Sequence, residues 1–153
     1  MIKESLLNLL KTNSTEYTYL EHAETKTSAE SAAIRGTRLE EGAKALILRG
    51  KVTGNNVMVV VPAHKKADLG KLSKIINEEL ELEFPNRILE RWSLQVGAVP
   101  PFGNLLDIPT YIDRSILENE RASFNCGSRT ASVIMKVRDM VKLINGTIGD
   151  YSQ

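Results

Sequence analysis

Residues 43–61, AKALILRGKVTGNNVMVVV, contain two strongly apolar runs and the turn between them, and this stretch decides the fold. The runs 43–49 and 57–61 are rich in Val, Ile, Leu and Met, which favours strands. Gly54-Asn55-Asn56 lies between the runs, and such a sequence is typical of a hairpin turn. The stretch therefore predicts an antiparallel hairpin at the core of a sheet.

Apolar spacing and turn residues predict further elements on both sides of this hairpin. The expected elements are helices over 2–12, 67–80 (the longest), 85–92 and 138–145, a short helix between the capping-box sequence Thr27-Ser28-Ala29-Glu30 and Gly36, and strands over 17–20, 108–112, 123–125 and 131–137. Helices and strands alternate irregularly. This order predicts a single α+β domain over residues 1–153, with a mixed sheet flanked by helices.

The composition is that of an ordinary globular protein. Of the 153 residues, 42% are hydrophobic and 25% are charged, which excludes a disordered chain. No apolar run approaches the roughly 20 residues of a membrane helix, and the first residues lack the pattern of a signal peptide. We therefore expect a cytoplasmic protein that does not contact a membrane.

Cysteine and histidine are scarce. Cys126 is the only cysteine, and the two histidines and the scattered carboxylates show no metal-ligand spacing. We expect no disulfide, no metal ion and no cofactor. Cys126 would act as a nucleophile only beside a base, and the sequence places neither His22 nor His64 there.

The formal net charge of +1 argues against a strongly basic nucleic-acid binder. Basic residues nevertheless cluster in two segments. One segment holds Lys65, Lys66, Lys71 and Lys74, and the other holds Arg129, Lys136, Arg138 and Lys142. Such clusters are either solvated faces or contacts for phosphate groups.

Gly97-Ala98-Val99-Pro100-Pro101-Phe102-Gly103 cannot be regular helix or the middle of a sheet. Proline restricts the backbone here, so the stretch is a rigid loop. The loop is either a tight turn between a helix and a strand or one wall of a pocket. Gly97 has no Cβ, which would let a ligand approach main-chain N–H groups.

Lys44 stands near the start of an apolar strand, and alternation places it on one face with Leu46 and Leu48. It is either an exposed lysine at the strand entrance or a lysine that points into a cleft. His22 stands at the end of the strand over 17–20. Both a structural role and a catalytic role are open for this histidine. Asn125-Cys126-Gly127-Ser128 has the residues of a sharp turn.

Together these features resemble the YbaK/ProX aminoacyl-tRNA deacylases, a family that includes the editing domain inserted in bacterial prolyl-tRNA synthetases. The resemblance rests on His22 after a strand, Lys44 at the start of another, Gly97-x-x-Pro100-Pro101-Phe102-Gly103, Asp113 shortly after a strand, and Asn125-x-Gly127. It runs from about residue 15 to residue 145, and the order of the motifs is more specific than any one of them. The resemblance implies a partly barrel-like sheet.

The resemblance also implies a free-standing trans-editing enzyme that hydrolyses the ester bond of mischarged tRNA. Binding alone separates amino acids that differ by one methylene by only ~1–3 kcal/mol, so errors must be removed afterwards. Lys44 and the backbone at Gly97 would be catalytic. The implied substrate-binding residues are His22, Ser28, Pro100, Pro101, Phe102, Gly103, Asn125 and Gly127. The implied partners are the acceptor end of aminoacyl-tRNA and an aminoacyl-tRNA synthetase.

This sequence departs from the family pattern at Ala45, where many members carry Thr or Asn. Ser128 and Arg129 do not identify the type of amino-acid pocket, so cysteine, alanine, serine and threonine all stay open. Two other functions also stay open. One is a non-catalytic module that binds a tRNA end or a synthetase, and the other is hydrolysis of a small acyl ester or amide.

Overall fold

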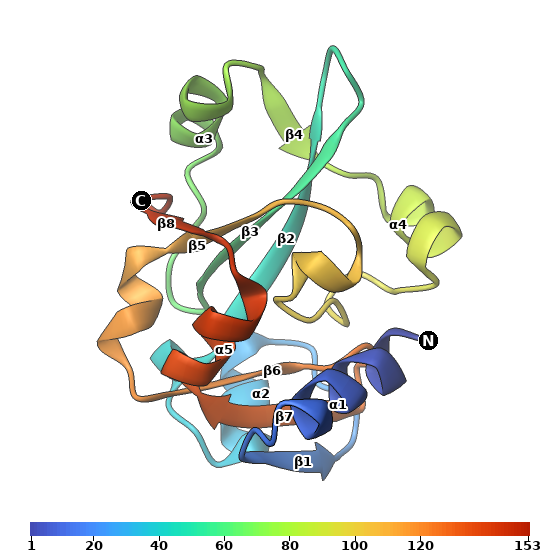
Figure 1. Ribbon diagram of the computed structural model, residues 1–153, viewed down its shortest axis with the longest axis vertical. Helices are drawn as coiled ribbons and strands as arrows, with labels where there is room; N and C mark the ends of the chain where they lie inside the picture. The colour runs from blue at the N-terminus through green and yellow to red at the C-terminus, as the bar shows by residue number, and fades with distance from the viewer.

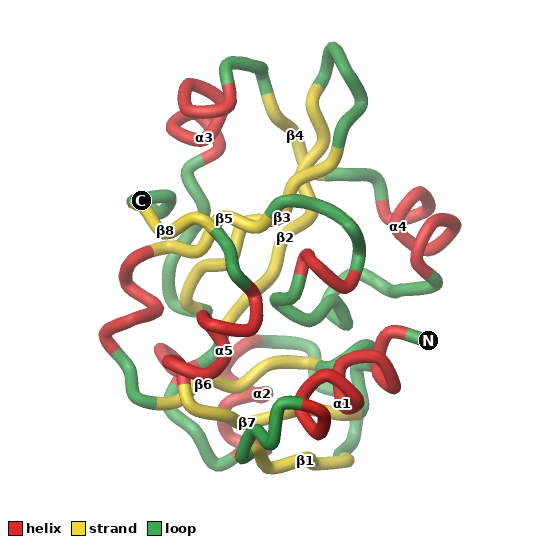
Figure 2. The backbone as a smooth tube through the Cα atoms, viewed as in Figure 1, coloured by secondary structure: helices red, strands yellow, loops and turns green.

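The computed structural model describes residues 1–153, and its strands form two sheets (Figures 1 and 2). The larger sheet has the order β4-β2-β3-β5-β8, and the smaller has the order β1-β7-β6. The strands of the larger sheet are β2 (Ala43–Gly50), β3 (Asn56–Pro62), β4 (Leu80–Leu82), β5 (Thr110–Asp113) and β8 (Thr147–Gly149). Those of the smaller sheet are β1 (Tyr17–Glu21), β6 (Arg121–Asn125) and β7 (Ala131–Lys136).

Five α-helices and three short 3-10 helices surround the sheets. The α-helices are α1 (Ile2–Thr12), α2 (Ser28–Arg35), α3 (Leu69–Ile76), α4 (Pro85–Trp92) and α5 (Val137–Ile144). The 3-10 helices are η1 (Leu39–Glu41), η2 (Gly103–Leu105) and η3 (Arg114–Glu118). No helix is both long and apolar enough to cross a bilayer.

The larger sheet is mixed. β2 and β3 form the expected antiparallel hairpin, with Lys44 opposite Val61 and Leu48 opposite Val57. β3 pairs with β5, and β5 with β8, in parallel. The α+β class with a mixed sheet is therefore confirmed, while the two sheets do not close into a barrel.

β3 lies between two hydrophobic clusters, which explains why its run is apolar throughout. Met58 and Val60 belong to the larger cluster, and Val57, Val59 and Val61 belong to the smaller one. Successive side chains of a strand point to opposite faces, so a strand with both faces covered needs an apolar residue at every position. β2 and β3 thereby form a rigid base for the residues that follow them.

The helix expected over 67–80 is shorter than the sequence indicates. α3 ends at Ile76, because Asn77 adopts a left-handed backbone (φ 65°). The carboxylate of Glu78 then accepts hydrogen bonds from the main-chain N–H groups of Val52 and Thr53, and Leu80 enters β4 opposite Gly50. The longest helix is therefore α1, and β4 and β8 are strands that the sequence pattern did not indicate.

Asp113, at the end of β5, holds the C-terminal segment. Its buried carboxylate accepts hydrogen bonds from Ser115, from the main-chain N–H of Tyr151 at 2.8 Å and from Ser152 Oγ at 3.0 Å. Burial opposes ionisation, but these hydrogen bonds outweigh it and lower the pKa of Asp113 below the usual value of 3.8.

We expect the stability of the fold to depend on this carboxylate in acid. A group whose pKa is lower in the folded state stabilises the fold above its unfolded pKa, and this contribution is lost as the pH falls through the folded pKa. Urea unfolding between pH 6 and pH 3 should therefore show a steeper loss of stability in the wild type than in Asp113→Asn. Asp150→Asn, at an exposed carboxylate, is the control. Equal slopes in wild type and Asp113→Asn would contradict the prediction.

Candidate active site

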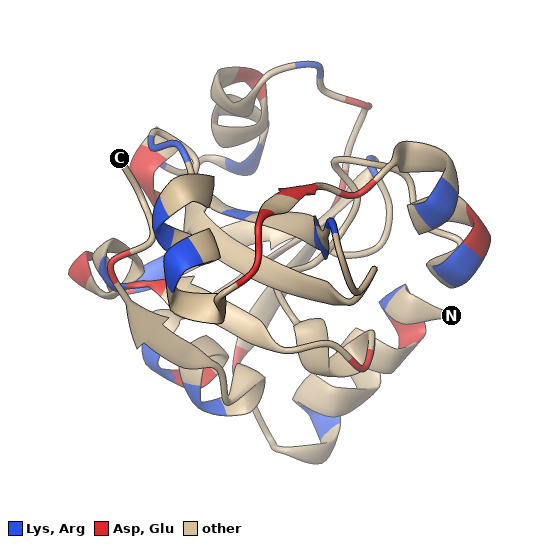
Figure 3. Ribbon diagram, turned by 90° about the horizontal axis from the view of Figure 1, so that it is seen from above, with Lys and Arg blue, Asp and Glu red and all other residues tan.

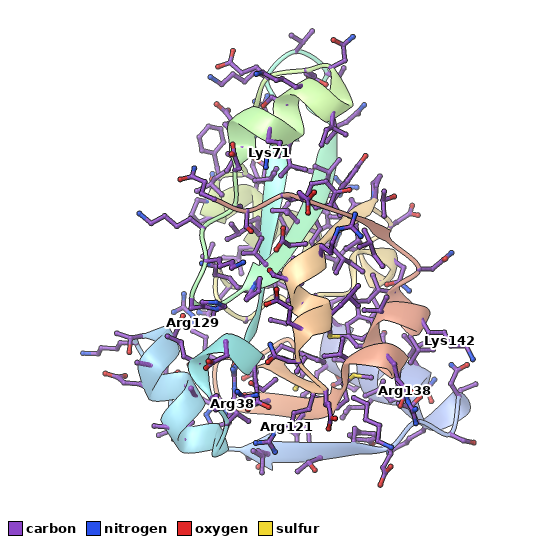
Figure 4. The ribbon with its side chains drawn as sticks, turned by 90° about the vertical axis from the view of Figure 1, so that its left-hand side faces the viewer. Arg38, Lys71, Arg121, Arg129, Arg138 and Lys142 are labelled. Carbon is purple, nitrogen blue, oxygen red and sulfur yellow. The ribbon has the colours of Figure 1, made fainter.

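A cleft with a volume of about 200 Å³ lies between α2, the first residues of β2 and the loop that contains Gly97. Four of its lining residues are cations, namely Lys26, Arg35, Lys44 and Arg129, and none is Asp or Glu. Figure 4 shows Arg129 beside α2. Over the rest of the molecule acidic and basic residues are interspersed (Figure 3). The cleft is thus suited to an anionic ligand.

α2 forms one wall of the cleft. Its start and end are those expected from the sequence, because Thr27 Oγ1 accepts a hydrogen bond from Glu30 N at 3.1 Å and Gly36 ends the helix with φ 69°. Ser28, Ser31 and Arg35 are spaced by three and four residues, so they share one face of the helix, and all three line the cleft.

Lys44 lines the cleft and is half-buried. Its ammonium group donates a hydrogen bond to the Lys65 carbonyl at 3.1 Å and forms no ion pair within 4 Å. Burial and, to a smaller extent, the charge of Lys66 lower the pKa of Lys44. The charge of Lys44 therefore has only a neutral partner, at the edge of the cleft. The remaining N–H groups of the ammonium are available to a ligand.

The Gly97 loop forms the opposite wall. Gly97 has φ 89°, a conformation that favours glycine, and both Gly97 and Val99 line the cleft. The N–H groups of Gly97 and Val99 donate no hydrogen bond within the protein, whereas Ala98 N–H donates to the Gln95 carbonyl at 3.0 Å. Two residues of this loop that line the cleft therefore have main-chain N–H groups without a partner in the protein.

The side chains of Asn125, at the end of β6, and Arg129, in the turn between β6 and β7, hold this loop in place. Asn125 Nδ2 donates to the Gly97 carbonyl at 2.5 Å, and Asn125 Oδ1 accepts from Arg35 Nη2 at 2.8 Å. Arg129 Nε and Nη2 both donate to the Val96 carbonyl, at 3.0 and 2.6 Å. Both amide atoms of Asn125 are engaged, so this side chain orients the loop.

Arg35 is a partly buried cation whose partners are all neutral. Its Nε donates to Ser132 Oγ at 2.9 Å and its Nη1 donates to Ser123 Oγ at 3.3 Å, beside the bond to Asn125. Burial lowers the pKa of Arg35 to about 10, and the guanidinium still keeps its charge at neutral pH. Since no carboxylate balances this charge, it adds to the attraction for an anion in the cleft.

The other residues expected at the site lie behind the cleft. Pro100, Pro101, Phe102, Gly103 and Gly127 are not among its lining residues. Phe102 is fully buried and packs on Phe124, with ring centroids 5.7 Å apart. A Cβ on Gly103 would lie 2.8 Å from the Ile108 carbonyl oxygen, and Gly127 N–H donates to the Ala98 carbonyl at 2.8 Å. In this structure these residues support the loop.

His22 and Cys126 are also outside the cleft lining. The ring of His22 hydrogen-bonds to Ser132 Oγ at 2.7 Å and to the Ala23 carbonyl at 2.8 Å. Cys126 is fully buried, and burial raises the pKa of its thiol to about 11. A thiol in that state is a poor nucleophile at neutral pH. No three His, Cys, Asp or Glu side chains gather as a metal site.

Four residues that line the cleft were not indicated by the sequence pattern, namely Arg35, Thr25, Lys26 and Ser31. Arg35 is in the last turn of a helix, where a basic residue is ordinary, so its sequence position carries no special signal. Thr25 Oγ1 and Ser31 Oγ lie 2.6 Å apart across the helix start. Arg35, in contrast, is placed by long-range hydrogen bonds to Ser123 and Asn125 in β6 and to Ser132 in β7.

Residues 22–143 match the family model of the aminoacyl-tRNA editing domain. The match covers most of the chain, so the protein belongs to this family, and the resemblance seen in the sequence is confirmed.

Two proteins of known sequence resemble the chain along most of its length. The multifunctional Ser/Thr-tRNA deacylase ProXp-y of Escherichia coli (strain K12) is 29% identical over 144 residues, which span 92% of this chain and 86% of that protein. The protein YwhH of Bacillus subtilis (strain 168) is 29% identical over 115 residues, which span 74% of this chain and 72% of YwhH.

Solved structures share the fold. The crystal structure of the hypothetical protein APE2540 has a TM-score of 0.86 at 24% identity, and the match covers 97% of this chain and 99% of that one. A crystal structure described as a candidate trans-editing enzyme for prolyl tRNA synthetase has a TM-score of 0.85 at 22% identity, with coverages of 99% and 96%. Both similarities confirm the α+β fold.

Proposed function

We propose that this protein is a free-standing trans-editing deacylase, which hydrolyses the ester bond between a wrong amino acid and the terminal ribose of a tRNA. One observation carries the proposal: a cleft with four cations and no carboxylate is lined by two loop residues, Gly97 and Val99, whose main-chain N–H groups have no partner in the protein. The cations suit the phosphates of an RNA end, and the donors suit a reacting ester carbonyl. The activity named for the E. coli relative agrees with the proposal.

In the proposed reaction the residues of the cleft bind and orient the substrate. Lys44 binds the phosphate or ribose of the terminal adenosine and positions the ester. Water attacks the ester carbonyl and forms a bond from its oxygen to the carbonyl carbon. The N–H groups of Gly97 and Val99 stabilise the negative charge that develops on the carbonyl oxygen, and they need no reorganisation because the loop is held by Asn125 and Arg129.

The bond between the carbonyl carbon and the ribose oxygen then breaks, and the proton that the attacking water loses ends on the leaving ribose oxygen. Cys126 is not the nucleophile in these steps, since water attacks the carbonyl. His22 lies outside the cleft lining, and its proposed contribution is the hydrogen bond to Ser132 Oγ, which Arg35 also contacts. Ser28 and Asn125 line the cleft and are proposed to contact the substrate, while the proposed contribution of Pro100, Pro101, Phe102, Gly103 and Gly127 is to hold the loop. The natural setting we propose is the cytoplasm, with a synthetase as a further partner.

Release of amino acid from a panel of aminoacyl-tRNAs tests this function. The panel includes tRNAs that are correctly charged and tRNAs mischarged with cysteine, alanine, serine or threonine. We expect one or more mischarged species to be cleared by the wild type, more slowly as the salt concentration rises. If no species is hydrolysed above the spontaneous rate, the protein is a binding module and not a deacylase. Hydrolysis of a small ester that free tRNA does not inhibit would instead favour a general esterase.

A further inference from the structure

Four lysines lie on the connection after β3 and on α3, namely Lys65 and Lys66 on the connection and Lys71 and Lys74 on the helix, and we call this segment the basic arm. None of their ammonium groups forms an ion pair within 4 Å. The arm begins at the cleft wall, because Ala63 lines the cleft and the Lys65 carbonyl accepts the hydrogen bond from Lys44. The only acidic residue within the arm, Asp68, accepts a hydrogen bond from Lys71 N at the start of α3.

The second basic cluster of the sequence is different in its surroundings. Arg129 pairs with Glu24 at 3.3 Å, and Lys136 pairs with Glu16 at 3.5 Å. Arg138 and Lys142 lie on α5. In the view of Figure 4 they are at one side of the molecule, and Arg129 is at the other. The basic arm is therefore the cluster of unpaired cations that is continuous with the cleft.

The path of the chain extends this charge away from the cleft. The connection from β3 to α3 starts at the end of β3 near α2 and runs along the molecule to α3 (Figure 1). Lys71, on α3, and Arg129, at the cleft, both lie on the face of the molecule that Figure 4 shows. Unpaired cations in a row repel one another, and a polyanion that lies along the row removes this repulsion.

We infer that the basic arm is the surface along which the RNA backbone enters the cleft. Lys65 and Lys66 contact the phosphates next to the terminal nucleotide, and Lys71 and Lys74 contact phosphates further from the end. These contacts recognise the charge of the RNA backbone and not its base sequence. They therefore position a tRNA without selecting one tRNA over another. The inference rests on the proposed function, since it takes an RNA 3′ end as the ligand of the cleft.

A pair of charge-matched double variants tests the inference. Lys65→Ala/Lys66→Ala removes two charges from the arm, and it leaves the Lys65 carbonyl that holds Lys44 in place. Arg138→Ala/Lys142→Ala removes the same charge from α5. Binding of deacylated, unfractionated tRNA is measured by fluorescence anisotropy over a series of KCl concentrations, and circular dichroism checks that both variants are folded.

We expect the arm variant to bind tRNA more weakly than the wild type, and its slope of log K against log salt to be smaller by about 1.4, at about 0.7 per phosphate contact. The α5 variant should keep the affinity and slope of the wild type. An equal loss in both variants would mean that only net charge matters, and this would overturn the inference. Unchanged binding in the arm variant would overturn it as well.

The same variants separate this inference from the proposed activity. If tRNA binding depends on the arm but the wild type hydrolyses no aminoacyl-tRNA, the deacylase proposal fails and the RNA surface stands. If the wild type is active and the arm variant hydrolyses the same substrate with an unchanged KM, the RNA surface fails and the deacylase proposal stands.

Discussion

Replacement of Lys44 by alanine is expected to lower kcat/KM for aminoacyl-tRNA hydrolysis by a factor on the order of 10², the usual loss when a group that positions the substrate is removed. Lys44 is half-buried, has no carboxylate partner and lines the same cleft as Gly97 and Val99. Its charge is therefore available to the substrate. The measurement is the rate of amino acid release from the mischarged tRNA that the wild type clears.

Two comparisons make this result specific to Lys44. Lys51→Ala removes an equal charge from the exposed end of the hairpin, where Lys51 pairs with Glu79, and it should leave the rate unchanged. The free energy of unfolding of Lys44→Ala should stay close to that of the wild type, because the side chain makes a single hydrogen bond and its charge is disfavoured by burial. An active Lys44→Ala variant would remove Lys44 from the proposed mechanism.

Replacement of Phe102 by alanine is expected to lower the free energy of unfolding by about 3–5 kcal/mol, the usual range for a buried phenylalanine. Phe102 has no exposed surface and packs on Phe124 in the larger hydrophobic cluster. Its loss leaves a cavity beneath the Gly97 loop. Urea unfolding monitored by circular dichroism measures the change.

Phe102→Leu distinguishes support of the loop from contact with the substrate. Leucine keeps most of the buried apolar volume, so we expect a smaller loss of stability and a KM near that of the wild type. A KM that rises strongly in a stable Phe102→Leu variant would show that the ring contacts the substrate. In that case the loop must open on binding, because the ring is enclosed in this structure.

Local patterns in the sequence were enough to predict most of the secondary structure. The apolar runs of the hairpin, the cap at Thr27 and the left-handed glycine at residue 36 depend on neighbouring residues, and the structure has them where they were expected. The helix over 67–80 was predicted too long, because apolar spacing continues through Leu80. The turn at Asn77 and the pairing of β4 with β2 are set by contacts distant in sequence.

Some residues of the candidate site could likewise be predicted from the sequence, and others could not. Motif order drew attention to Lys44, Gly97, Ser28 and Asn125, and these four residues line one cleft. It also drew attention to Phe102 and its neighbours, which lie behind the loop, since a Pro/Gly pattern predicts rigidity but does not tell which side faces a ligand.

The sequence by itself determined the fold class, the family and four of the residues that line the cleft. Only the tertiary structure decided that Arg35 lines the cleft and that Arg35 and Lys44 have no carboxylate partner. It also separated the unpaired lysines of the basic arm from the paired residues Arg129 and Lys136. The physical reason is that charge pairing and burial depend on distances between segments far apart in the chain, which no local pattern contains.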